Sequence, residues 1–378
     1  MSTLPFAHLL LLEPLGFLYG SSGRMLSPEA LTGRACEHFP PDSPTISGLI
    51  ASQLERPSGV AKEETPLYNL HTAGPFCYDS ESGDLWLPAP FTLRQGISGE
   101  AAGDSDAQTL HQLTWACREG DEPAGAWHPP EGQEHSRKAS TGGWLALKQW
   151  PLVRDSAATG GKAPGNADPL RLRADPWEAV PHLHPRLRSD ERVSEGDNAL
   201  FLEYGIALKP GFCLAYLSSH AIPAGRYRFG GEGHLVELRC TELPHLLVNL
   251  LQEPLTGPFA LITPGVWGGP RLSRREPLDH SHTPASHPWH RHGTPPAILT
   301  ERPRPWRHLL GPSTAVSTPH GAYRLSRGRW AVPAGTCYRV EGGLAPWADW
   351  SPHWFPKEGF SFKQFGTALA LPLHSTSS

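Results

Sequence analysis

The sequence lacks most of the features that define common enzyme and membrane-protein classes. Its six cysteines contain no CxxC pair, which excludes zinc ribbons and thioredoxin-type sites, and their wide scatter is typical of a reduced, cytoplasmic protein. The short apolar run at residues 9–12 has no basic segment before it and ends at Glu13-Pro14, so we expect no signal peptide and no membrane span. The motifs GxGxxG, GxxxxGK[ST], GxSxG and HExxH are also missing. We therefore predict no cofactor, no small-molecule substrate and no catalytic residues.

Glycine and proline are abundant instead. The 378 residues include 39 Gly and 41 Pro, yet 38% of the chain is hydrophobic. This composition excludes a coiled coil, a helical bundle and a wholly disordered chain. It indicates a protein of strands and loops that carries long irregular insertions.

The net charge of −4 conceals an uneven distribution. Residues 1–135 carry 6 basic and 18 acidic side chains, whereas residues 270–330 carry 10 Arg and 3 acidic side chains. Of the 33 basic residues 26 are Arg, which pairs with phosphates and stacks on bases. A genomic codon bias explains the excess of Arg over Lys equally well.

Apolar patterning predicts the ordered elements. In the first half we expect strands at 7–12, 71–78 and 84–87, and a strand or the start of a helix at 142–147. We also expect a helix at 45–54, because Ser43 and Pro44 are typical of the residues that mark a helix start. In the centre, alternation over 200–208 and a return at 212–217 predict a hairpin. A strand at 234–240, a helix at 244–251 and a strand at 259–263 predict a βαβ unit. Residues 97–140 and 154–176 are expected to be loops, and 268–320 is not expected to contribute to a core.

A glycine-rich stretch at 226–234 is the first candidate site. Its glycines, Gly230, Gly231 and Gly233, let the backbone approach a ligand closely and present N–H groups to an anion. The flanking Arg226 and Arg228 can pair with phosphates. A tight turn into the next strand explains the same residues about as well.

The expected start of the helix at 45–54 is a second candidate, because hydroxyl groups and a glycine at a helix N-terminus suit an anion. Ser47 and Gly48 are its candidate residues, although ordinary helix capping is the favoured explanation. A third candidate is the basic, aromatic stretch from Arg271 to Trp330, in which Arg304, Trp306 and Arg307 stand together. A solvated loop is the simpler alternative there.

Two histidine-containing segments remain. Five histidines lie within residues 280–292 and could bind a soft divalent metal, but without an evident carboxylate we predict a solvated basic loop. The segment 182–192 combines two histidines with three arginines, including Arg188, and could contact RNA.

Five short segments, in order, resemble the third subunit of the type III-B CRISPR effector, the Cmr complex. This subunit is a repeat-associated (RAMP) protein that holds the 5′ end of the guide RNA. The matching segments are 12–24 (a "PLDPLFFRDGRPF"-type opening), 39–48 ("FPPSPSTVAGAL"), 74–90 ("GPF…FPAP"), 229–233 ("LGGEG") and 332–338 ("VPAGSVY"). Ser22 departs from the acidic residue expected before Gly23, and Leu18-Tyr19 stands where the family has a Phe-rich loop.

The resemblance implies an α+β fold of two ferredoxin-like domains. The first covers 1–177 and carries insertions at about 97–140 and 154–176. The second covers 178–378 and carries an insertion at about 268–320. It implies a non-catalytic subunit that binds the 5′ handle of the crRNA and contacts both the large polymerase/cyclase-like subunit and a backbone RAMP subunit. We expect RNA contacts from the glycine-rich stretch, the helix start and the basic stretch, together with Arg24. These candidate residues are Arg24, Ser47, Gly48, Arg188, Arg226, Arg228, Gly230, Gly231, Gly233, Arg304, Trp306 and Arg307.

Two alternatives stay open. Related RAMP proteins cleave precursor RNA without a metal by using a histidine as general base, and His184 or His234 would serve here. A metal-dependent hydrolase that uses the histidines of 280–292 is the third possibility.

Overall fold

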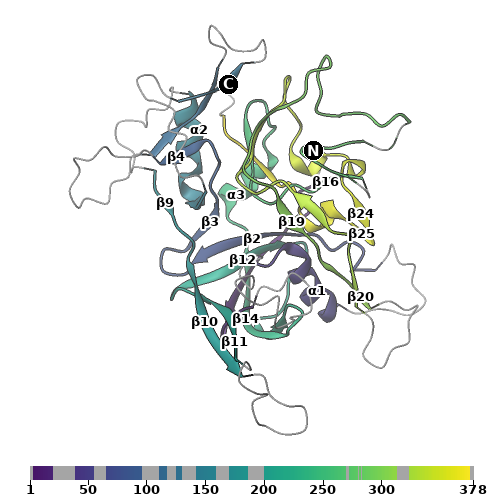
Figure 1. Ribbon diagram of the computed structural model, residues 1–378. Coiled ribbons are helices and arrows are strands. Elements are labelled where there is room, and N and C mark those ends of the chain that lie inside the picture. Colours follow the sequence, from purple (N-terminus) through teal and green to yellow (C-terminus); the bar gives the residue numbers. More distant parts are fainter. Residues whose placement is uncertain are drawn as a thin grey trace, which may run out of the picture.

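The computed structural model describes most of the chain (Figure 1). The described residues are 3–19, 39–54, 65–95, 110–116, 125–129, 142–158, 170–185, 200–269, 272–279, 281, 283–312 and 323–374. The candidate residues Arg24 and Arg188 lie outside them, as do His280 and His282. Among the described residues, no helix is long and apolar enough to cross a membrane.

An antiparallel sheet of eight strands forms the centre of the molecule (Figure 1). Its order is β13 (Gly225–Phe229), β14 (His234–Glu242), β1 (His8–Pro14), β12 (Phe212–Ser218), β2 (Thr72–Asp79), β3 (Asp84–Pro88), β8 (Trp144–Ala146) and β9 (Leu172–Arg173). The strands predicted at 7–12, 71–78, 84–87 and 234–240 are therefore confirmed. The segment at 142–147 forms β8 and then passes through a 3-10 turn, η2 (Leu147–Gln149), into helix α2 (Trp150–Ala158).

The sheet buries side chains on both of its faces because its central strands are apolar at almost every position. On one face, Leu10 and Leu12 of β1 pack with α1 (Ser43–Gln53), which buries Ile46 and Ile50. On the other face, Leu9 and Leu11 join a larger core. The helix predicted at 45–54 is confirmed, and Pro44 lies at its first turn, where a missing N–H costs nothing.

A second antiparallel sheet shares the larger core. Its order is β18 (Ala297–Leu299), β23 (Cys337–Arg339), β15 (Phe259–Leu261) and β26 (Ala370–Pro372). Helix α3 (His245–Gln252) packs into the same core through Leu247 and Leu250. The indole of Trp150 in α2 donates a hydrogen bond to the Pro372 carbonyl at 2.9 Å, so the last strand is tied to the first half of the chain.

Short two-stranded ribbons complete the fold. They are β4 (Leu93–Gln95) with β5 (Leu110–Gln112), β6 (Thr114–Ala116) with β7 (Ala126–His128), β16 (Trp267–Gly268) with β17 (Ser273–Arg274), β19 (Arg304–Trp306) with β22 (Arg329–Ala331), β20 (Leu309–Pro312) with β21 (Tyr323–Leu325), and β24 (Lys357–Glu358) with β25 (Phe360–Ser361). Further 3-10 turns are η3 (Trp347–Asp349), η4 (Pro352–Trp354) and η5 (Phe362–Phe365). Strands β5, β6 and β7 lie inside 97–140 and β9 lies inside 154–176, where loops were expected.

The predicted hairpin between 200–208 and 212–217 is wrong, although both strands exist. Strand β11 (Leu200–Leu208) pairs with β10 (Trp177–Pro185), and this ribbon projects from the molecule (Figure 1). Strand β12 instead lies between β1 and β2 and uses both of its edges there. Residues 213–218 are all buried, as expected for a strand in the middle of a sheet. The apolar β12 is therefore placed between two strands of the large sheet and not in the ribbon with β11.

The predicted βαβ unit is also wrong as a unit. Its strand, helix and strand are present as β14, α3 and β15, but β14 belongs to the eight-stranded sheet and β15 to the four-stranded sheet. A βαβ crossover requires both strands in one sheet. The chain between them therefore links two sheets.

The prediction that 268–320 contributes nothing to the core is wrong. Trp289 and Trp306 are each 1% exposed and lie in the larger core. The Trp289 ring packs against Phe259, Trp267 and Tyr338, with centroid distances of 5.0–5.7 Å. Large indole surfaces can thus anchor a segment that is otherwise rich in Pro, His and Arg.

The eight-stranded sheet combines strands from both sides of the predicted boundary at residues 177 and 178. Strands β1, β2, β3, β8 and β9 precede that boundary, and β12, β13 and β14 follow it. The overall composition of sheets with few helices agrees with the predicted α+β class. The two ferredoxin-like domains stay a prediction.

Candidate nucleic-acid interface

The hairpin of β13 and β14 carries the glycine-rich stretch at one end of the large sheet. The two strands pair from Gly225↔Leu238 to Phe229↔His234, and among the described residues β13 pairs with no other strand. Phe229 is 1% exposed and packs against Tyr216, which fixes the end of β13 on the core. The loop of residues 230–233, called the glycine loop below, is held outside the sheet by this anchor.

The backbone of the glycine loop requires glycine at two of its positions. Gly230 has φ +77° and Gly233 has φ +68°, values that other residues adopt only with strain. The Gly233 N–H donates to the Gly230 carbonyl at 3.2 Å, which closes the turn around Gly231 and Glu232. Gly230, Gly231 and Glu232 are exposed, so this backbone is accessible to a ligand.

One face of the β13–β14 ribbon is open to solvent. Residues two apart in a strand share a face, and so do residues paired across the ribbon. The side chains that share this open sheet face are exposed in every case and comprise Arg226, Arg228, Leu235, Glu237 and Arg239. Their neighbours Tyr227, Val236 and Leu238 point to the opposite face and pack in the smaller core.

Arginine dominates the charge of this face. Arg226 lies opposite Glu237, and Arg228 lies opposite the 48% exposed Leu235. Arg228 also reaches back over the glycine loop, since its Nη1 lies 3.4 Å from the position a Cβ would take on Gly233. No ion pair of Arg226 or Arg228 is found within the described part of the chain. The face therefore presents cations beside an apolar side chain and an exposed loop backbone.

The start of α1 lies beside the glycine loop, so two candidates that the sequence offered separately are neighbours in the fold. A Cβ placed on Gly230 would meet Thr45 Cγ2 at 4.0 Å. Ser47, however, faces inward: it is 8% exposed, it donates to the Ser43 carbonyl at 3.0 Å, and it lies 2.7 Å from Thr72 Oγ1. Gly48 is exposed. Of this pair, only Gly48 lies at the surface as an RNA contact would require.

The 304–307 segment meets the same region. Leu309 Cδ1 lies 3.6 Å from a Cβ placed on Gly231, and Arg304 forms an ion pair with Asp42, the residue before α1. Trp306 is 1% exposed, so it supports the core and offers no ring for base stacking. Arg307 is exposed and its Nε donates to the Ser326 carbonyl at 2.9 Å.

His234 joins the hairpin to the first strand region. Its Nε2 accepts a hydrogen bond from the Tyr19 N–H at 3.3 Å and lies 3.1 Å from Glu232 Oε2. The His234 side chain is 17% exposed, and the centroid of its ring lies 5.4 Å from that of the Tyr19 ring. These contacts give His234 a positioning role between the glycine loop and residue 19. Of the other candidate base, His184, only the backbone in β10 is described.

The structure thus brings together the glycine loop, the start of α1 and the 304–309 segment, which are far apart in the sequence. Leu235 and Arg239 belong to the same face and were missed by the sequence analysis. The alternation of exposed and buried residues along β14 was a usable signal for them.

Comparison with known proteins gives a limited result. No family model and no curated protein matches the chain. Among solved structures, a chain of the type III-B Cmr-beta complex bound to cognate target RNA is similar, with TM-score 0.44 and 11% identity over 88% of this chain and 86% of that chain. A chain of the same complex with AMPPnP, state 1, gives TM-score 0.42 and 10% identity over the same shares. These likenesses assign no role to any residue of this chain.

Proposed function

We propose that this chain is a non-catalytic RNA-binding subunit of a type III CRISPR ribonucleoprotein effector. In this proposal it recognises the 5′ handle of the crRNA and joins the large polymerase/cyclase-like subunit to a backbone RAMP subunit, in antiviral defence in the cytoplasm. The five ordered motif resemblances in the sequence support it. The acidic region at 1–135 suits contacts with basic surfaces of the protein partners.

The open sheet face is the observation that carries the proposal. Single-stranded RNA is bound on sheet surfaces through phosphate contacts from Arg and through stacking or apolar contacts with splayed bases. Arg226 and Arg228 supply the cations, Leu235 supplies an apolar surface, and the exposed glycine loop allows a close approach of RNA to the backbone. Three of the five motif segments, at 39–48, 229–233 and part of 12–24, meet at this face or beside it.

The test compares RNA carrying the handle with handle-scrambled RNA of equal length. Affinity is measured by fluorescence anisotropy at several salt concentrations, with the isolated chain and with the assembled complex. The Arg226→Ala/Arg228→Ala variant should bind more weakly. The matched control is Arg171→Ala, which removes an exposed arginine next to β9, at the opposite edge of the same sheet.

Loss of two phosphate contacts has a calculable size. Each contact to a single strand contributes about 0.7 to the slope of log K against log salt, so two contacts amount to about 1.4. This difference in slope corresponds to about 25-fold in affinity at 0.1 M salt relative to 1 M salt. The control should keep the wild-type affinity and slope. Equal binding of handle and scrambled RNA by the assembled complex would contradict the proposed recognition of the handle. An unchanged salt slope in the double variant would contradict the proposed role of the open sheet face in RNA binding.

The absence of catalysis is tested separately. Precursor repeat RNA is incubated with the purified chain in EDTA, and products are resolved on a denaturing gel. The proposal expects intact RNA. Discrete cleavage that is lost in His184→Ala or His234→Ala would instead assign the chain to the metal-independent endonucleases.

A further inference from the structure

Glu276, His287 and His290 form a compact group of metal-ligating side chains outside the proposed RNA interface. His290 Nε2 lies 2.7 Å from Glu276 Oε1, and His287 Nδ1 lies 3.2 Å from the same oxygen. All three candidate ligand atoms lie within 4.8 Å of one another. The two imidazole rings are 4.3 Å apart. Glu276 supplies the carboxylate that the sequence did not reveal beside the histidine cluster.

The scaffold holds these groups in place. Trp289 lies between the two histidines in the sequence and is buried in the aromatic core, so the turn carrying them is anchored there. The His290 N–H donates to the His287 carbonyl at 3.1 Å and closes that turn. Asp279 and Ser286 exchange two backbone hydrogen bonds of 2.9 and 3.0 Å, which tie the segment of Glu276 to the segment of the histidines. A site held before the metal arrives loses little entropy on binding.

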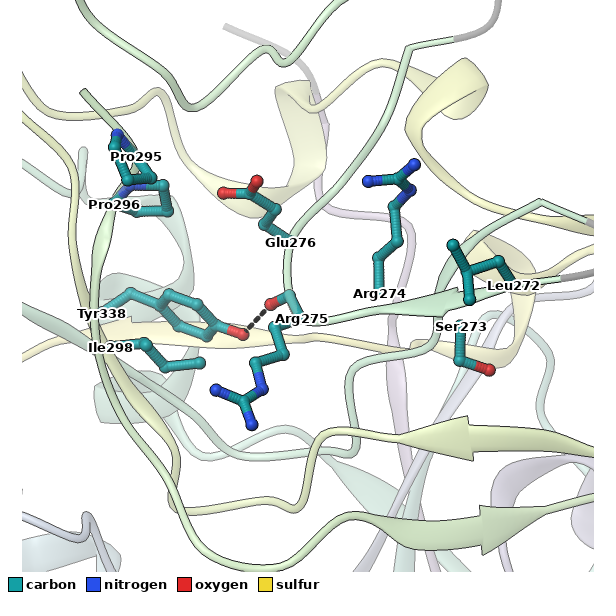
Figure 2. A pocket seen from close by; sticks show the side chains of 9 residues that line it. All are labelled: Leu272, Ser273, Arg274, Arg275, Glu276, Pro295, Pro296, Ile298 and Tyr338. Carbon is teal, nitrogen blue, oxygen red and sulfur yellow. Dashed lines mark hydrogen bonds between the residues drawn. The ribbon is translucent and has the colours of Figure 1, made fainter. Parts of the chain in front are cut away.

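Glu276 also lies in the wall of a cavity of about 430 Å³ (Figure 2). Its carboxylate extends from the segment after β17 toward Pro295 and Pro296, while Arg275 points the opposite way (Figure 2). The Tyr338 hydroxyl donates a hydrogen bond to the Arg275 carbonyl and fixes this wall. The side chains of Glu276, His287 and His290 are 18%, 34% and 26% exposed, so an ion can reach them from solvent.

We propose that Glu276, His287 and His290 bind one divalent zinc ion, with water in the fourth position. Two imidazoles and one carboxylate are a ligand set that suits zinc and disfavours magnesium and calcium, which take oxygen ligands. Tetrahedral zinc, with bonds of about 2.0–2.2 Å, holds its ligand atoms about 3.4 Å apart, so the 3.2 Å pair already fits. The 2.7 Å pair must open by about 0.7 Å, which a small rotation of the partly exposed His290 achieves.

The metal replaces a pair of hydrogen bonds. Without it, a single carboxylate oxygen accepts from both imidazoles, which holds the segments together only weakly. With it, the ion binds all three side chains and fastens the 286–294 turn to residue 276. This site is independent of the proposed RNA binding, since none of its residues belongs to the open sheet face.

Cobalt(II) is the probe, because four-coordinate cobalt absorbs strongly in the visible range. The full chain, freed of metal, is titrated with CoCl₂ and then with ZnCl₂, and bound metal is counted by native mass spectrometry. The wild type should bind one equivalent that gives the tetrahedral cobalt spectrum, and zinc should displace it. Zinc should also raise the midpoint of thermal unfolding.

The variants decide which side chains bind the ion. His287→Ala/His290→Ala and the milder Glu276→Gln should lose the tetrahedral spectrum and the zinc-dependent rise in midpoint, while their midpoints without metal show that they fold. His292→Asn is the control, since His292 is exposed in the same loop at φ 51°, a conformation that Asn tolerates. The proposal would be overturned if the wild type bound no metal ion tightly. It would also be overturned if His287→Ala/His290→Ala and Glu276→Gln both kept one tightly bound ion, or if His292→Asn lost it.

Discussion

Trp306 and Trp330 show how far the environment decides the role of a residue. They lie on the paired strands β19 and β22, yet Trp306 is 1% exposed and Trp330 is 55% exposed. From composition, all aromatic rings of the basic stretch from Arg271 to Trp330 were expected at the surface. The stretch has no clear periodicity, so its sequence does not indicate which rings are buried. Arg304 and Ser47 stay candidate RNA contacts, although both polar groups already have partners: Arg304 forms an ion pair with Asp42, and the buried Ser47 hydroxyl lies against that of Thr72.

The two tryptophans therefore make a matched pair for mutation. Trp306→Ala should lower the free energy of unfolding by about 3–5 kcal/mol because it opens a large cavity in the core. Trp330→Ala should change it by less than about 0.5 kcal/mol. Urea denaturation measures both, and comparable losses in the two variants would contradict the burial described here.

His308 predicts a pH dependence of stability. It lies against Phe362 and Phe365, and neither ring nitrogen has a hydrogen-bond partner among the described residues. Burial lowers the pKa of His308 from 6.5 to about 4; nearby Glu358 raises it and Arg329 lowers it further. Since the folded chain holds this imidazole neutral, its contribution to stability is complete above pH 6.5 and is lost as the pH falls toward 4.

The expected loss is about 3 kcal/mol between pH 7 and pH 4, from a pKa difference of about 2.5 units. His308→Leu should remove this part of the slope. Free energies of unfolding of both proteins, measured from pH 7 to pH 4, give the difference directly. Parallel curves for the two proteins would show that His308 titrates normally in the folded chain.

At the scale of elements, local patterns predicted single strands and helices well and their pairing poorly. Strands β1, β2, β3 and β14 and helix α1 follow from alternation, apolar runs and a proline at the first helical turn. The partner of β11 did not, because the choice between β10 and β12 depends on which neighbours the buried β12 already has. Such competition between distant strands leaves no local trace in the sequence.

Gly48 and Gly230 should respond in opposite ways to the same substitution. Gly48 is exposed in α1, with nothing within 4 Å of an added Cβ, so Gly48→Ala should stabilise the fold by about 0.5–1 kcal/mol. Gly230→Ala places a Cβ at φ +77° and should cost about 1–2 kcal/mol. Thermal unfolding separates the two cases, and a stabilised Gly230→Ala variant would contradict the loop conformation.

RNA binding by the same variants tests the candidate contacts. If RNA passes close to the backbone at Gly48, Gly48→Ala should bind more weakly even though it folds more stably. Wild-type affinity in that variant would confine the interface to the glycine loop and the open sheet face. Anisotropy with the handle RNA measures this.

At the scale of the molecule, the eight-stranded sheet requires both halves of the chain. Strand β12 lies between β1 and β2, and β14 lies on the other side of β1. Fragment 1–177 lacks β12 and β14. Fragment 178–378 lacks β1 and β2, the strands with which β12 and β14 pair. The division into domains at 1–177 and 178–378 stays a prediction, and the shared sheet makes it testable.

Neither fragment should therefore fold alone. We expect 1–177 and 178–378 to be insoluble or unfolded when expressed singly and to recover the native circular dichroism spectrum when expressed together. The whole chain should melt in one calorimetric transition. A cooperative transition in either isolated fragment would show that the shared sheet is dispensable.

The exposed edge of the large sheet has a consequence for handling the protein. Within the described residues β13 has a neighbour only in β14, so its other side offers unpaired backbone groups to any extended chain, including a second copy. Charged side chains on such a strand oppose self-association, and Arg226 and Arg228 both project from it. The arginines that we propose for RNA binding thus also protect against aggregation, and light scattering of the double variant should detect oligomers that the wild type does not form.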